Sequence, residues 1–251
     1  MGFGKSTFSI NLRKYYENKK INTLLIDFDF YNSSINTILG INKYSSNIKK
    51  RCLEDLIIRI SRNMNVICAL DLILKNDKEF DYLKINEIFK KLKEKYEIII
   101  IDNSSNISNI YQKILLNSCD KNIFLIEPNL SEIKKAKNYL EIYIKDWNID
   151  KNKIRIIFNK VNKYSICYNI LEEIFSEFEI IGTINYNEKF NLFINKNGNL
   201  NLYNDYKEIY NLINFEEIKN EERRINNINK YKMLLKDKYV KRFIFRRKHS
   251  I

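Results

Sequence analysis

The chain has 251 residues, of which 45% are apolar and 30% are charged. This length and composition fit one α/β domain with a sizeable core and exclude a small disulfide-stabilised module. The apolar runs are short and interrupted by Lys, Asn or Asp, so none approaches the roughly 20 apolar residues of a membrane-spanning helix. The four cysteines are scattered and the chain has one histidine, which argues against a zinc site. We therefore expect a cytoplasmic protein.

The net charge of +13 is concentrated at the end of the chain. Residues 223–251 contain eleven Lys and Arg and one acid, which gives this segment a charge of +10 and leaves +3 for residues 1–222. This distribution indicates a basic appendage acting on an anionic surface, rather than a basic domain. From residue 215 onward the helical periodicity continues without a strand, so we expect one domain over 1–214 and a basic helical extension over 215–251.

Strand-like runs alternate with amphipathic stretches of helical length along the first 190 residues, as in a doubly wound, mostly parallel sheet with helices on both faces. The predicted strands are 21–28, 64–69, 97–102, 122–127, 154–159 and 179–184, and the predicted helices are 6–17, 85–95, 107–118, 131–145 and 166–178. The unbroken run Ile98–Ile101 is typical of a strand covered on both faces, which predicts a central position in the sheet. Ser131 is the predicted N-cap of its helix.

The segment Gly2-Phe3-Gly4-Lys5-Ser6-Thr7, directly before a helical pattern, is the strongest chemical signal. Glycines let a loop curl so that its N–H groups point at phosphate oxygens. A lysine contacts the β and γ phosphates, a Ser or Thr hydroxyl binds Mg²⁺, and the start of the helix favours an anion. The alternative is a glycine-containing tail that caps a helix.

Two later strands end in acids, which favours the phosphate-binding interpretation. Asp27 and Asp29 follow the run Leu24-Leu25-Ile26, and their alternation along a strand predicts one shared face at its carboxyl end. Asp102 follows the run of four isoleucines, the usual Walker B arrangement for holding Mg²⁺.

With these residues in this order, the chain resembles the MinD/ParA family of deviant Walker P-loop ATPases over residues 2 to about 213. The family's fingerprint is a Lys-Gly-Gly-x-Gly-Lys-Ser/Thr loop, a strand ending Asp-x-Asp, a strand ending in Asp, and Asn-Arg or Asn-Lys after a later strand. Asn159-Lys160 supplies the last motif, the segment 181–187 resembles the family's Ile-Pro-Tyr-Asp segment, and Gly198 stands where a glycine normally follows.

The resemblance implies ATP and Mg²⁺ as cofactors and a role for each matching residue. Lys5 would contact the β and γ phosphates, and the loop amides of Gly2, Phe3 and Gly4, with Thr7, would hold the phosphates. Ser6, Asp27 and Asp102 would hold the metal, Asp29 would position the attacking water, and Asn159 would read the adenine edge.

The sequence departs from the family pattern at the start of the loop. Met1 stands where the first loop glycine is expected, and neither the signature lysine nor the strand that feeds the loop is present in the 251 residues. From this we expect a chain truncated at its N-terminus, in which two neighbouring strands each have an unpaired edge. Asp102-Asn103-Ser104-Ser105 replaces the common Asp-Thr-Pro-Pro, and this favours the TadZ or CpaE pilus-localisation branch.

Together these features predict a slowly hydrolysing molecular switch that dimerises on ATP and positions a larger assembly, such as pilus, secretion or division machinery, through an unknown protein partner. The alternatives are a hydrolysis-deficient nucleotide-binding scaffold and a ParA-like DNA-partitioning ATPase. The basic residues 223–251 are expected to bind a protein partner, an anionic membrane surface at which the protein would be peripheral, or nonspecific DNA.

Overall fold

The computed structural model describes residues 4–29, 34–41, 52–68, 82–103, 110–188 and 210. Residues 1–209 form one compact unit and residues 210–251 form another, in which Tyr210 is the described residue. Met1, Gly2, Phe3, Ser104, Ser105, Gly198 and the predicted extension 215–251 lie outside the described residues. Within the described ranges, no helix is both long enough and apolar enough to cross a membrane.

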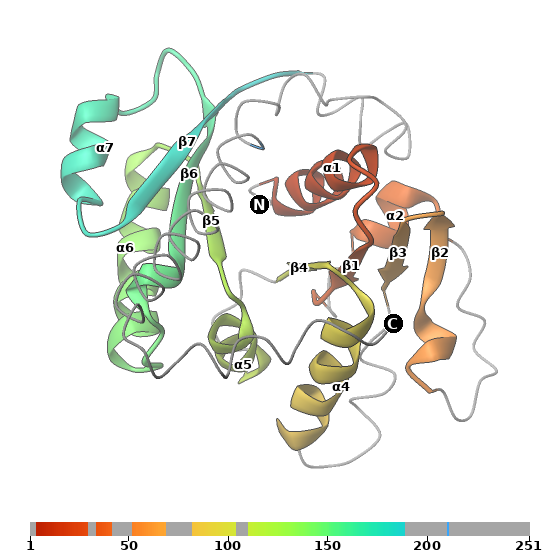
Figure 1. The fold of residues 1–251 in the computed structure, drawn as a ribbon. Helices are drawn as coiled ribbons and strands as arrows, with labels where there is room; N and C mark the ends of the chain where they lie inside the picture. The colour runs from red at the N-terminus through yellow and green to blue at the C-terminus, as the bar shows by residue number, and fades with distance from the viewer. Residues whose placement is uncertain are drawn as a thin grey trace, which may run out of the picture. The chain divides into compact units, whose positions relative to one another are not determined.

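The described elements alternate between helices and strands, as the sequence predicts (Figure 1). The helices are α1 (Lys5–Asn18), α2 (Ile35–Leu39), α4 (Tyr82–Lys95), α5 (Ile110–Ser118), α6 (Leu130–Lys145) and α7 (Tyr168–Ile174), with 3₁₀ turns η1 (Glu54–Leu56) and η2 (Lys151–Lys153). The strands are β1 (Thr23–Asp27), β2 (Ile58–Ser61), β3 (Met64–Ile67), β4 (Ile98–Asp102), β5 (Asn122–Ile126), β6 (Ile154–Val161) and β7 (Glu179–Asn185). All six predicted strands are present.

The strands form two sheets, of order β2-β3-β1-β4 and β5-β6-β7. Every described pairing is parallel except that of β2 with β3, which is antiparallel. Strand β2 was not predicted. Its residues Ile58-Arg59-Ile60-Ser61 alternate between apolar and polar types, but the strand has only four residues, and Arg59 and Ile60 are both exposed in the structure.

Helices cover both faces of the first sheet. Leu24 and Ile26 of β1 pack with α4 and with Leu115 of α5 in one hydrophobic core. On the opposite face, Ser6 of α1 donates a hydrogen bond to Asp102 of β4. The second sheet has its own core, which joins residues of β6 to α6 and α7 and includes Phe158, Leu140 and Phe175. The fold is therefore α/β and doubly wound, as expected.

The prediction of a central position for Ile98–Ile101 is wrong for the described strands, because β4 pairs only with β1 and ends its sheet. The reason is that an apolar run reports the helices above and below a strand, whereas centrality depends on hydrogen-bonded neighbours at its edges. Strand β5 likewise pairs on one side only, with β6. Strands β2 and β7, at the other ends of the two sheets, also pair on one side only, so four described strands each have one unpaired edge.

The predicted N-cap of α6 is also wrong. Asn129, not Ser131, caps the helix, and its side-chain oxygen accepts a hydrogen bond of 3.0 Å from the N–H of Glu132. Ser131 lies inside the first turn because the helix starts at Leu130. Both residue types favour an N-cap, so composition alone did not distinguish them.

Candidate functional site

The site begins at the first residue of the loop that the structure describes. Gly4 precedes α1 in a left-handed conformation, with φ of 77°, which glycine adopts without the steric penalty of a Cβ. A Cβ built on Gly4 would lie 2.9 Å from Nδ2 of Asn159, 155 positions later in the chain. This contact brings together the start of the predicted phosphate loop and the predicted adenine-reading residue.

Ser6 lies at the centre of a hydrogen-bonded group at the start of α1. Its hydroxyl donates to the carboxylate of Asp102 at 2.5 Å and accepts from the hydroxyl of Ser34 at 2.6 Å. Ser9, one turn further along α1, donates to the other oxygen of Asp102 at 3.4 Å. Three hydroxyls and one carboxylate therefore gather where α1 meets the end of β4.

The two predicted metal carboxylates are neighbours. Asp27 and Asp102 are paired positions in the register of β1 and β4, and they are 1% and 3% exposed. Asp27 accepts hydrogen bonds from the N–H of Asp29 at 3.0 Å and from the N–H of Ile35, the first residue of α2, at 3.3 Å. Asp27 is therefore held by two main-chain N–H groups at the end of β1.

Asp29 lies two residues beyond the end of β1, so the alternation that predicted a shared face with Asp27 stops before it. Its carboxylate instead acts on Lys5. Burial lowers the pKa of Lys5 below its usual value, while the charges of Asp102 and Asp29 oppose that change. The ammonium group of Lys5 is therefore within electrostatic reach of both strand-end acids.

Burial raises the pKa of Asp102 to about 7, and the negative charge of Asp27 adds to this rise. Hydrogen bonds from Ser6 and Ser9 and the charge of Lys5 act in the opposite direction. Desolvation outweighs the bonds because a buried carboxylate gives up its hydration. A cation placed between Asp27 and Asp102 would offset both the desolvation and the mutual repulsion of these acids.

Asn159 lies near the carboxyl end of β6 and is 5% exposed. The pairing of β6 with β7 shifts register between Asn159 and Val161, and the intervening Lys160 has a left-handed backbone with φ of 59°. Lys160 forms an ion pair with Glu127, at the end of β5, with an N–O distance of 3.5 Å. The end of β6 that approaches Gly4 is therefore irregular and is tied to the end of β5.

The structure brings together Gly4, Lys5, Ser6, Asp27, Asp29, Asp102 and Asn159 of the predicted site residues. Thr7 is buried in the first turn of α1, and its carbonyl accepts a hydrogen bond from the side chain of Asn11. Ser9 and Ser34 were missed. Ser9 could have been found because it follows Ser6 by three positions on a helix and so shares its face, but Ser34 reaches the site through tertiary structure alone.

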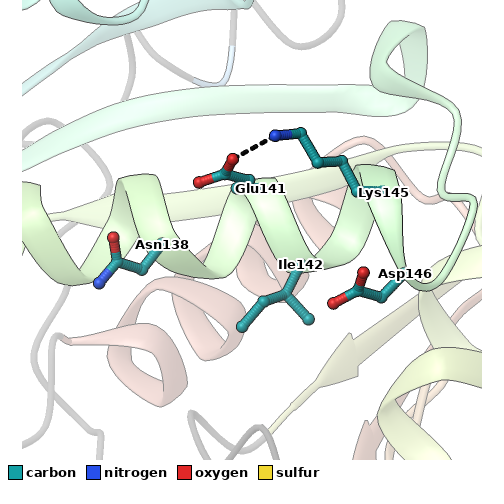
Figure 2. Close-up of a pocket in the computed structure, with 5 residues that line it drawn as sticks. All are labelled: Asn138, Glu141, Ile142, Lys145 and Asp146. Atoms are coloured by element: carbon teal, nitrogen blue, oxygen red, sulfur yellow. Dashed lines mark hydrogen bonds and ion pairs between the residues drawn. The ribbon is translucent and has the colours of Figure 1, made fainter.

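An open hollow of about 410 Å³ lies elsewhere, on the outer side of α6. It is lined by Asn138, Glu141, Ile142, Lys145 and Asp146, and Figure 2 shows the ion pair between Glu141 and Lys145 at its rim. These residues belong to the second half of α6, whereas the first residue of α6 follows the carboxyl end of β5. The hollow is therefore remote from the carboxyl ends of the strands, where Asp102 and Asn159 lie, and we assign it no function.

Solved structures share this fold. The MinD cell division protein of Aquifex aeolicus matches with a TM-score of 0.67 and 20% identity over 86% of this chain and 92% of that chain. A plasmid partition protein of Borrelia burgdorferi bound to AMPPNP matches with a TM-score of 0.68 and 22% identity over 86% and 95%. MinD of Pyrococcus horikoshii, in complex with Mg-ADP, matches with a TM-score of 0.66 and 17% identity over 83% and 90%.

Sequence comparison points to the same group of proteins. The chain is similar to the protein MJECL24 of Methanocaldococcus jannaschii, with 27% identity over 73% of this chain and 80% of that protein. The family model of the CobQ/CobB/MinD/ParA nucleotide-binding domain matches residues 2–200. The match covers most of the chain and includes every residue of the site described above. The protein is thus a member of the CobQ/CobB/MinD/ParA nucleotide-binding domain family.

Proposed function

We propose that the protein is an ATP-binding molecular switch that dimerises on ATP, hydrolyses it slowly and positions a larger assembly. The observation that carries this proposal is the convergence of Gly4, Ser6, Asp102 and Asn159 at the start of α1. A glycine turn, a lysine and a helix start are the parts that hold nucleotide phosphates, and acids at the ends of neighbouring strands are the parts that hold their metal.

In this proposal the loop amides of Gly2, Phe3 and Gly4 and the start of α1, including Thr7, hold the phosphates. Without nucleotide, the negative charges of Asp102 and Asp29 stabilise the ammonium group of Lys5. With nucleotide bound, this ammonium group would contact the β and γ phosphates. The side chain of Asn159, which lies beside Gly4, binds the edge of the base, as the resemblance to the family implies. Asp29 orients the water that attacks the terminal phosphate.

The donor set around Ser6 fits magnesium, which prefers hard oxygen ligands and is held by one or two carboxylates together with phosphates. Ser6, Asp27 and Asp102 supply a hydroxyl and two buried carboxylates. Phosphate oxygens and water would complete the shell around Ser6, Asp27 and Asp102. Bound there, Mg²⁺ neutralises charge on the phosphates.

The switch would control where a larger assembly is placed in the cell. This is supported by the similar solved structures, which include division and plasmid-partition proteins and a complex of MinC with MinD from Aquifex aeolicus. A homodimer formed on ATP would present one surface to a partner protein in the ATP state and lose it after hydrolysis. Pilus localisation is the branch that the Asp102-Asn103 segment favours.

Two alternatives use the same site. A nucleotide-binding scaffold would bind ATP through Lys5 without turnover. A DNA-partitioning ATPase would use the +10 charge of residues 223–251 on duplex DNA. A salt-sensitive gel shift with random duplex that is lost on deleting 223–251 would support the second alternative, and no shift at low salt would eliminate it.

The test is ATP-dependent dimerisation of the full chain, measured by light scattering with Mg-ATP and with Mg-ADP, together with calorimetric binding of each nucleotide. We expect a dimer with ATP only, and loss of nucleotide binding in Lys5→Ala. Lys14→Ala, on the same helix, is the matched control and should behave as the parent chain. Binding without dimerisation would leave the scaffold alternative, and no binding by the parent chain would refute the proposal.

A further inference from the structure

Ser34 stands directly before α2 but does not act as its N-cap. A serine in this position usually accepts a hydrogen bond from a main-chain N–H of the first helical turn. Here no side-chain cap bond forms, and the backbone of Ser34 is in the αR region, with φ of −103°. Its hydroxyl instead donates to Oγ of Ser6 at 2.6 Å. The contact with Ser6 has therefore replaced the usual role of a serine at the start of a helix.

The oxygen of Ser34 is available as a ligand. A serine hydroxyl has one proton to donate and two lone pairs that accept. The proton of Ser34 goes to Ser6, and none of the described residues donates a hydrogen bond to its oxygen. Hard cations such as Mg²⁺ prefer oxygen ligands. The oxygen of Ser34 could therefore coordinate such a cation without losing a hydrogen bond from a described donor.

Ser34 is linked to every residue of the proposed magnesium site. Ser6, which accepts the proton of Ser34, donates its own to the carboxylate of Asp102 at 2.5 Å. The residue after Ser34, Ile35, donates its N–H to the carboxylate of Asp27 at 3.3 Å. Asp27 and Asp102 are paired positions of β1 and β4. Two hydroxyls and two buried carboxylates are thus joined in one hydrogen-bonded group.

The spacing of the two hydroxyls fits neighbouring ligands of one magnesium ion. Mg²⁺ holds its oxygen ligands at about 2.0–2.1 Å in an octahedral shell, so adjacent ligand oxygens lie about 2.9 Å apart. The oxygens of Ser34 and Ser6 are 2.6 Å apart. Moving them apart by about 0.3 Å, with the proton of Ser34 turned away from Ser6, would suit joint coordination.

We propose that Ser34 is a further ligand of the magnesium ion, in a position that water would otherwise take. This inference rests on the proposed function, because Ser6 is the proposed magnesium ligand beside which Ser34 lies. When the metal and nucleotide bind, the hydrogen bond between Ser34 and Ser6 is exchanged for coordination of one ion by both hydroxyls. Ser34 also connects the metal to α2, because the helix begins at the next residue, Ile35.

The experiment measures how much Mg²⁺ improves the binding of ADP to the full chain. ADP is titrated by calorimetry with excess Mg²⁺ and again with EDTA, and the Kd in EDTA divided by the Kd with Mg²⁺ is the magnesium coupling. Ser34→Ala should lower this coupling about tenfold, because even groups that only support metal ligands change metal affinity by about 10- to 100-fold. The Kd in EDTA should stay unchanged.

Thr37→Ala is the matched control. Thr37 is an exposed residue of the same helix, and its hydroxyl contacts the side chain of Asn36 at 3.4 Å. The substitution removes a hydroxyl from α2 as Ser34→Ala removes one directly before it, but it leaves the group around Ser6 intact. Its magnesium coupling should equal that of the parent chain.

Ser34→Cys distinguishes a metal ligand from a structural residue. A thiolate is a soft ligand that Zn²⁺ binds well and that does not suit Mg²⁺. With Mg²⁺ this variant should behave as Ser34→Ala does. With Zn²⁺ in place of Mg²⁺, its coupling should exceed that of the parent chain by about tenfold. The parent chain measured with Zn²⁺ controls for the four native cysteines.

A magnesium coupling in Ser34→Ala equal to that of the parent chain would overturn the proposal. An equal loss of ADP binding with Mg²⁺ and with EDTA would also overturn it, because that pattern indicates a structural role. If Ser34→Ala does not fold, the Zn²⁺ comparison decides, and no gain in Ser34→Cys over the parent overturns the proposal. A parent chain that binds ADP in neither condition would instead refute the proposed function, together with the ligand set that includes Ser34.

Discussion

Replacing Gly4 by alanine tests the geometry on which the site depends. Two costs follow from the structure. A residue with a Cβ pays about 1–2 kcal/mol for the left-handed backbone that Gly4 adopts at φ 77°. The new methyl group would also lie 2.9 Å from Nδ2 of Asn159, whose side chain is buried and has to leave its rotamer at a cost of about 0.5–1.5 kcal/mol. We expect a total loss of about 2–3 kcal/mol.

The assay is thermal unfolding without nucleotide, followed by calorimetric titration with Mg-ATP. For a domain of this size the loss corresponds to a fall in Tm of about 4–12 °C. Gly40→Ala is the matched control, because Gly40 also has a left-handed backbone, with φ 65°, but ends α2. It should pay the backbone cost alone and should leave nucleotide binding unchanged, whereas Gly4→Ala should weaken binding.

A double-mutant cycle isolates the contact between Gly4 and Asn159. In an Asn159→Ala background the methyl group of Gly4→Ala has no amide to displace, so its cost should fall to that of Gly40→Ala. If Gly4→Ala costs as much in this background as in the parent chain, the contact does not exist and the reasoning about the site is refuted.

The remaining predictions concern charge and capping. The pKa of Asp102 in the folded chain, about 7, lies above its ordinary value of 3.8, so the protonated carboxyl stabilises the fold. That contribution of up to about 4 kcal/mol is lost as pH rises from about 4 to 7. Asp102→Asn should remove this decline in urea unfolding without nucleotide, and a variant with the parent's pH profile would contradict the prediction. Arg13 is 2% exposed, and its Nε and Nη1 have no hydrogen-bond partner among the described residues. Arg13→Met should therefore raise the free energy of unfolding by about 1–3 kcal/mol, and a lower value would show that the guanidinium is compensated. Asn129→Ala should cost about 1 kcal/mol through loss of the α6 cap, while Ser131→Ala should stay within about 0.5 kcal/mol; the reverse order in thermal unfolding would restore Ser131 as the cap.

The family and the element types could be predicted from the sequence because their signals are local. The glycine and lysine of the loop precede a helical pattern directly, and the acids Asp27 and Asp102 follow apolar strands directly. The periodicity of apolar residues in a short window indicates which faces of a strand or helix are buried. This local signal correctly located all six predicted strands. The same signal missed β2, which alternates in residue type but has only four residues.

Local patterns did not reveal which segments become neighbours. The apolar run of β4 gave no information on its edges, so its place at the end of a sheet came from the pairing alone. The choice of Asn129 over Ser131 depended on where α6 begins. Ser34 joined the site only because the fold brings it to Ser6, 28 positions earlier in the chain.

The sequence by itself determined the residue types of the site and their order along the chain. Only the tertiary structure decided that Asp27 lies opposite Asp102, that Gly4 approaches Asn159, and that burial shifts the pKa of Asp102 to about 7. The physical reason is that residue type and spacing act through short-range backbone preferences, whereas distance, desolvation and charge coupling depend on residues far apart in the chain that packing alone brings together.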